Sequence, residues 1–111
     1  MAEEKKERKR QFNKIQLSGN LGADPEYSKE KGYFRFPLPV ENGPNEKIGW
    51  VRAVLFRDLA HEAAKKNLKK GSYVQITNGR LKVVPWEKDG KKGVNVEVLV
   101  NEIKFFEDDE S

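Results

Sequence analysis

The stretch from Trp50 to Phe56 alternates small apolar residues with larger ones, a period typical of a β-strand. In a strand, Val51, Ala53 and Leu55 share one face, which suits the interior of a fold. The opposite face then carries Trp50, Arg52, Val54 and Phe56. Aromatic planes accept unstacked nucleic-acid bases, and cations neutralise phosphates, without reading a sequence. The pattern therefore predicts binding of an unpaired nucleic-acid strand.

Further aromatic residues fit the same chemistry. Trp86 lies in a lysine-rich segment, read here as a hairpin loop in which no core is available to it. In the predicted strand Tyr33–Val40, alternation places Tyr33 and Arg35 on the outward face. We predict base contacts from Trp50, Trp86, Phe56 and Tyr33. The competing interpretation is that these rings pack beneath the helix or against another subunit.

Basic residues on or beside the predicted strands are the candidate phosphate contacts: Lys14, Arg35, Arg52, Arg57, Arg80 and Lys82. The lysines in the last turns of the predicted helix, Lys65, Lys66, Lys69 and Lys70, favour the negative end of its dipole instead. The N-terminal residues are basic but interleaved with glutamates, and we expect a modest, salt-sensitive contribution from them.

The remaining periodicity supplies the elements that position these residues. Strands are expected at Ile15–Leu21, Tyr33–Val40, Ile48–Arg57, Tyr73–Val84 and Val94–Lys104, with a helix capped by Asp58 and ending at Gly71. Pro37 and Pro39 indicate an edge-like second strand. Residues 85–93 read as a hairpin loop with Asp89-Gly90 as its turn. The order β-β-β-α-β-β predicts an all-β fold with one helix, a five-stranded OB-fold barrel.

Length and composition exclude several classes of protein. The 111 residues suit one domain, assigned to residues 12–106 between a basic arm (1–11) and an acidic tail (107–111). Lysine and arginine number 22 against 18 acidic residues, and the net charge of +4 permits phosphate binding. There is no cysteine, and the single histidine, His61, is expected to be a solvated residue in the first helical turn. No metal, cofactor or catalytic pattern is present, so we expect neither an enzyme nor a cofactor. No apolar run is long enough for a membrane span, and we expect a cytoplasmic protein.

Several segments together resemble the bacterial single-stranded DNA-binding proteins. They are Asn13–Glu26, Trp50–Phe56, Leu68–Ser72 and the stretch from Leu81 to Trp86. The resemblance implies an OB fold, usually a tetramer, acting in DNA replication, recombination and repair at the nucleoid. It also implies base contacts from Trp50, Phe56 and Trp86, with Lys14 and Arg52 near the bound strand.

The chain departs from the family pattern at several points. Residues 42–47 contain no aromatic residue, so one stacking platform is missing. Val51 stands where the family often has histidine near a subunit contact, which leaves a tetramer and a dimer both open. Thr77–Arg80 is one residue longer than usual, which indicates a β-bulge. The final residues lack the family's linker and hydrophobic tip, so recruitment of replication partners through such a tip is not expected.

Three alternatives remain open from the sequence. The first is an RNA-binding OB module, because stacking and phosphate contacts serve both nucleic acids. The second is a dimeric replication-restart accessory protein that acts mainly through protein contacts. The third is an interaction domain whose aromatic face is a subunit interface.

Overall fold

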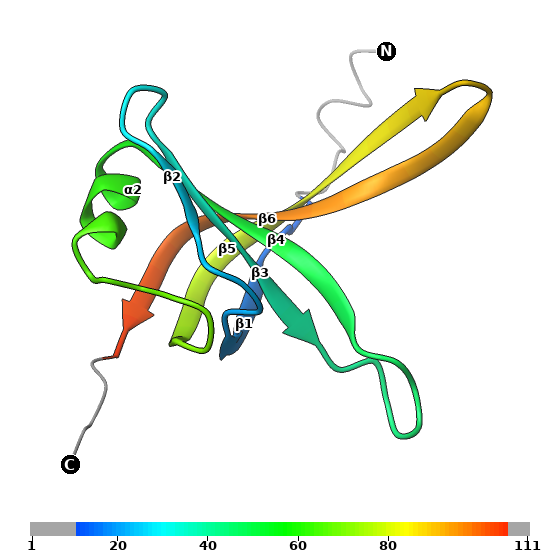
Figure 1. The fold of residues 1–111 in the computed structure, drawn as a ribbon. Helices are drawn as coiled ribbons and strands as arrows, with labels where there is room; N and C mark the ends of the chain where they lie inside the picture. The colour runs from blue at the N-terminus through cyan, green and yellow to red at the C-terminus, as the bar shows by residue number, and fades with distance from the viewer. Residues whose placement is uncertain (1–10, 107–111) are drawn as a thin grey trace, which may run out of the picture.

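The structure is a computed structural model that describes residues 11–106, so most of the predicted arm and all of the acidic tail lie outside it. Its elements are β1 (Ile15–Asn20), β2 (Glu26–Ser28), β3 (Tyr33–Val40), β4 (Gly49–Phe56), α2 (Arg57–Ala64), β5 (Tyr73–Lys88) and β6 (Lys91–Phe105). The strands form one sheet in the order β1-β5-β6-β4-β3-β2 (Figure 1). Within residues 11–106, neighbouring strands are antiparallel except for β4 and β6, which are parallel.

The core forms on the face that alternation assigns to the interior. Its largest fully buried side chains come from β3, β4, β5 and β6: Phe36, Leu38, Leu55, Val74, Ile76 and Val98. Helix α2 adds Ala60 and Ala63, both fully buried. Small side chains allow the short helix to sit close against β3 and β4. The expected inward faces of these strands are therefore confirmed.

The sheet curves until its first and third strands approach each other. Just after β1, the Leu21 N–H donates to the Ser72 carbonyl at 2.8 Å, and the Gly22 N–H donates to the Pro37 carbonyl at 3.1 Å. Two successive residues thus tie the start of β5 to the middle of β3. This closure gives the sheet a concave, filled interior and a convex outer side.

The short strand β2 was not predicted. It pairs with the start of β3, with Glu26 opposite Arg35 and Ser28 opposite Tyr33. Three residues are too few to show a period, so the segment read as a loop. Beyond β2, the portion of β3 that holds Pro37 and Pro39 pairs only with β4. In the part of the chain that the structure describes, no strand pairs with the other side of this portion, so the missing N–H groups interrupt no ladder, as expected for proline in a sheet.

The hairpin of β5 and β6 is longer than predicted. Asp89 and Gly90, at φ 52° and 78°, form the expected two-residue turn. The prediction that the rest of residues 85–93 form a loop is wrong, since β5 continues to Lys88 and β6 begins at Lys91. The paired strands project from the body as a ribbon, drawn in yellow and orange in Figure 1. A register shift around Asn78 confirms the irregularity expected in Thr77–Arg80.

The helix is shorter than predicted and starts differently. Its N-cap is Phe56, with no side-chain cap, and Asp58 lies in the first turn rather than at the cap. The chain leaves β4 abruptly because Arg57 adopts a left-handed φ of 55°. Helix α2 ends at Ala64, well before Gly71, and Lys65 is its C-cap. Within residues 11–106 no helix has the length and apolarity needed to cross a membrane.

Candidate nucleic-acid interface

The convex side of the sheet collects most of the predicted site residues. We call this the outer face and define it by the side chains of β3, β4, β5 and β6 that point away from the core. The strand register aligns them in rows. One row joins Arg35, Val54, Leu99 and Arg80, and the next joins Pro37, Arg52, Glu97 and Lys82. Four of the six predicted cations therefore lie in two adjacent rows across the same face.

Trp50 lies on the outer face of β4 and rests on a glycine of another segment. Its side chain is 57% exposed, and its partner across the ladder is Pro39. A Cβ atom added to Gly22 would lie 2.7 Å from Cη2 of the indole, closer than such contacts occur. The absence of a side chain at Gly22 thus lets the ring approach the backbone closely. One side of the ring is supported while much of the rest stays open to solvent.

Trp86 has the same arrangement on the ribbon. The β5–β6 register places it opposite Gly93, and 43% of its side chain is exposed. A Cβ at Gly93 would lie 2.5 Å from Cζ2 and 2.7 Å from Cε2 of the ring. Trp86 therefore lies in a paired strand and not in a loop, which corrects the sequence prediction. Both tryptophans are held as platforms by glycines that lie beneath them.

Each tryptophan borders a surface depression. One is bounded by Trp86, Gly93 and Val94, and the other by Trp50, Arg52 and residues 94–97 of β6. Val94 contributes to the lining of both depressions.

Phe56 and Tyr33 extend the aromatic series to the far end of β4. They are partners across the β3–β4 ladder, and Phe56 is 51% exposed. Arg57 follows at once, and its N–H donates to the Gly32 carbonyl at 2.8 Å. Its left-handed φ, unusual for a residue with a side chain, turns the backbone sharply at this point. The predicted Phe56, Tyr33 and Arg57 are thus neighbours at the end of the outer face.

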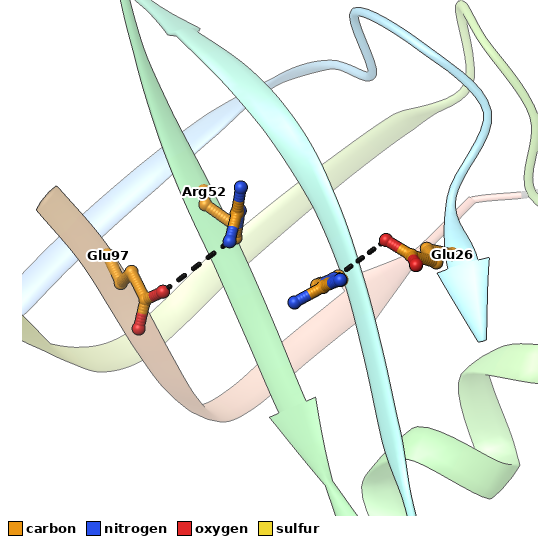
Figure 2. Close-up of polar contacts among 4 residues, drawn as sticks. Glu26, Arg52 and Glu97 are labelled. Atoms are coloured by element: carbon orange, nitrogen blue, oxygen red, sulfur yellow. Dashed lines mark hydrogen bonds and ion pairs between the residues drawn. The ribbon is translucent and has the colours of Figure 1, made fainter. Parts of the chain in front are cut away.

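Arg35 is held by two neighbours on the outer face. Its Nε donates to Oε1 of Glu26 at 2.8 Å, and its guanidinium carbon lies 4.8 Å from the centre of the Tyr33 ring. Figure 2 shows the hydrogen bond to Glu26 beside the contact of Arg52 with Glu97. The hydrogen bond from Arg35 holds the pKa of the Glu26 carboxyl below its ordinary value, and the same bond raises the pKa of Arg35. Arg35 is consequently a fixed cation, stacked on an aromatic ring.

Arg52 is held less firmly. Its Nη1 lies 3.7 Å from Oε2 of Glu97, which is beyond hydrogen-bond distance, and its side chain is 52% exposed (Figure 2). The guanidinium is therefore attracted by the carboxylate but is not oriented by it. It remains free to turn toward a ligand in the depression beside Trp50.

The remaining predicted cations lie toward the other edge of the sheet. Arg80 and Lys82 are exposed on β5. Lys14 precedes β1 and borders a separate depression with Gln16 and Thr77. The segment before β1 is fixed to β5 because Asn13 exchanges two hydrogen bonds with the backbone of Leu81, at 2.8 and 2.9 Å. Lys14 is thus near the cation rows but borders neither of the depressions beside the tryptophans.

Three features differ from the sequence interpretation or were absent from it. Val54 has outward parity but is only 6% exposed, because Arg35 and Leu99 flank it on the neighbouring strands. His61 lies in the last turn of α2, half-buried, with Nδ1 2.7 Å from the Tyr27 hydroxyl, and is therefore not a solvated residue of the first turn. The carboxylates of Glu26 and Glu97 were missed, because their partners are known only once the strands are paired.

Comparisons with known proteins decide the family. The model of the "Single-strand binding protein family" matches residues 12–106, nearly the whole described region. The chain belongs to the single-strand binding protein family. The chain is also 34% identical, over 85% of its own length and 76% of the relative's, to "Single-stranded DNA-binding protein 1" of Xylella fastidiosa. Its general function is therefore single-stranded DNA binding, and it is not an enzyme.

Solved structures give the fold of this family member. A small single-stranded DNA-binding protein from Streptomyces coelicolor matches with a TM-score of 0.70 and 21% identity, over 86% of this chain and 96% of that one. The mitochondrial protein Rim1 of S. cerevisiae matches with a TM-score of 0.67 and 17% identity, over 88% and 98%. These likenesses confirm the predicted OB fold, here with the added short strand β2.

Proposed function

We propose that this family member binds single-stranded DNA along the outer face, without sequence preference, by stacking bases on Trp50 and Trp86. The observation that carries the proposal is the shared arrangement of the two rings. Each is exposed, each lies close against a glycine, and each borders a surface depression. Stacking on aromatic planes suits every base, so no particular sequence is required.

Other residues on and beside the outer face supply further contacts in this proposal. Phe56 and Tyr33 continue the stacking surface beyond Arg52, and Arg57 lies beside them. Arg52, Arg80 and Lys82 neutralise phosphates on the adjoining strands, and Lys14 serves a strand that runs past β1. Arg35 acts as a flat, fixed cation over Tyr33 because Glu26 restrains it.

The biological setting follows from this binding mode. We place the protein in the cytoplasm, at the nucleoid, protecting unpaired strands during replication, recombination or repair. We also expect a homo-oligomer, either a dimer or a tetramer. Leu81 and Val83 support this, because they are 39% and 53% exposed on the ribbon, on the side opposite Lys82. Sedimentation equilibrium of the full chain gives the number of subunits, and a monomer at micromolar concentration contradicts this part of the proposal.

Tryptophan fluorescence tests the binding mode directly, because the chain has only two tryptophans and both lie on the outer face. Titration with oligo-dT should quench the emission strongly, with an affinity that falls as salt rises. Duplex DNA should quench little, because its bases are already stacked. A stronger response to oligo-rU would assign the surface to RNA. No response to any strand would assign the aromatic residues to a subunit or partner interface.

A further inference from the structure

Glu97 is a carboxylate placed among the cations of the outer face. On one side its partner in the sheet is Arg52 of β4, and on the other it is Lys82 of β5. Arg35 lies one row away, and its raised pKa includes an attraction to Glu97. A single negative charge thus faces three of the cations that we assign to DNA phosphates. The side chain of Glu97 is only 22% exposed, so water screens these attractions incompletely.

The geometry of the Glu97 contact separates it from that of Glu26. Glu26 accepts a directional hydrogen bond at 2.8 Å and thereby fixes the orientation of Arg35. Glu97 lies 3.7 Å from Arg52, too far for a hydrogen bond, so it lowers the positive potential without orienting the guanidinium. Both carboxylates lower the positive potential of their arginines. A phosphate must break a hydrogen bond to replace Glu26 at Arg35, but it can replace Glu97 at Arg52 without breaking one.

We infer that Glu97 is an internal competitor for DNA phosphates and sets the affinity of the outer face. This inference rests on the proposed function. When a strand binds, a phosphate takes the place of the Glu97 carboxylate at Arg52, and the carboxylate turns toward Lys82 or water. Binding is weaker than the cations alone would give, and release of the strand is correspondingly easier. Loss of the charge at Glu97 should therefore tighten binding.

The test compares Glu97→Gln with Glu62→Gln, which removes the same charge from the exposed side of helix α2. Both variants have the same net charge, so any general electrostatic effect is equal in them. Affinity for oligo-dT is measured by fluorescence titration at several salt concentrations. We expect Glu97→Gln to bind about two- to fivefold tighter than Glu62→Gln, the range of an exposed ion pair.

A second comparison shows whether the effect acts through Arg52. In an Arg52→Gln background, the gain from Glu97→Gln should fall toward that of Glu62→Gln, because the contested cation is gone. Equal affinities of Glu97→Gln and Glu62→Gln, or weaker binding by Glu97→Gln, would overturn the inference while the proposed function stands. If the wild-type chain binds no strand at all, both fail together. Circular dichroism of each variant confirms that the sheet is intact.

Discussion

The indole ring of Trp86 lies over the backbone of Gly93, its partner across the β5–β6 hairpin. The pairing joins a base-stacking candidate to a position that tolerates no side chain. The same relationship links Trp50 to Gly22, but through tertiary packing and not through strand pairing. In both cases the ring lies close against the backbone before a ligand arrives, which reduces the ordering that binding requires.

Gly93→Ala should weaken binding of oligo-dT without removing any contact group. The added methyl would lie 2.5 Å from Cζ2 of Trp86, so the ring must move away from Gly93. Because one base should lose part of its stacking energy, we expect the affinity for oligo-dT to be about two- to tenfold lower. The measurement is a fluorescence titration at fixed salt.

The matched control for that variant is Gly19→Ala. A Cβ at Gly19 meets Pro39 at 3.4 Å, which is ordinary contact distance, and neither tryptophan is among its nearest neighbours. This variant should bind as the wild type does. If Gly93→Ala and Gly19→Ala show equal affinities, the support of Trp86 by Gly93 has no role in binding.

Removal of either ring itself gives the larger effect. Trp50→Ala and Trp86→Ala should each lower the affinity for oligo-dT by roughly 5- to 150-fold, since each stacked base contributes about 1–3 kcal/mol. Phe106→Ala is the control, because Phe106 is also an exposed aromatic but contacts Tyr73 beyond the end of β6. Wild-type affinity in both tryptophan variants, with the fold intact, would exclude the stacking assignment.

Alternation was enough to predict which side of the sheet each strand residue faces. The pattern of Trp50–Phe56 placed two aromatics and Arg52 opposite the buried Ala53 and Leu55, as the structure has them. It failed at Val54, whose parity is outward but whose neighbours Arg35 and Leu99 cover it. Alternation predicts the side of the sheet to which a side chain points. Its burial depends also on the size of the side chains on the neighbouring strands.

The support of Trp86 was also present in the sequence, although it was not recognised. Trp86 and Gly93 are equally distant from the turn at Asp89-Gly90, so a continuous hairpin must pair them. The proline and charges of residues 85–93 hid this, because they are typical of a loop. The contacts of Gly22 with Trp50 and of Glu97 with Arg52 are different. They join segments far apart in the chain, and no local period encodes them.

Lys82 should contribute to binding mainly through its charge. On single strands each phosphate contact adds about 0.7 to the slope of log affinity against log salt concentration. Lys82→Ala should therefore reduce that slope by about 0.7. Lys69→Ala removes the same charge from an exposed position after α2 that is not part of the outer-face rows, and it should leave the slope unchanged. Equal slopes in the two variants would remove Lys82 from the interface.

The Glu26–Arg35 contact predicts a titration that NMR can follow. The hydrogen bond from Arg35 lowers the pKa of the Glu26 carboxyl, so the contact stabilises the fold above the unfolded pKa. That contribution is lost as the pH falls through the lowered value of the folded state. Carbon-detected titration of the carboxyl should show the pKa of Glu26 rising in Arg35→Gln. An unchanged pKa in that variant would mean that the contact does not persist in solution.

Arg57 combines a strained backbone with a predicted phosphate contact, and substitution should separate the two. Its φ of 55° is costly for a residue with a Cβ atom, and glycine adopts it freely. The left-handed conformation costs roughly 1–2 kcal/mol, and the greater chain entropy of glycine takes back about 0.5–1 kcal/mol. Arg57→Gly should therefore raise the free energy of unfolding by about 1 kcal/mol in denaturant titrations. The same change should reduce the salt slope for oligo-dT, because the charge is lost.

Arg57→Lys provides the complementary variant, since it keeps both the charge and the unfavourable φ. It should leave the stability and the salt slope near their wild-type values. If Arg57→Gly gains stability and keeps the full salt slope, Arg57 turns the chain at the end of β4 but does not contact the bound DNA. If it loses stability, the left-handed turn is maintained by contacts of the Arg57 side chain, and the strain argument is wrong.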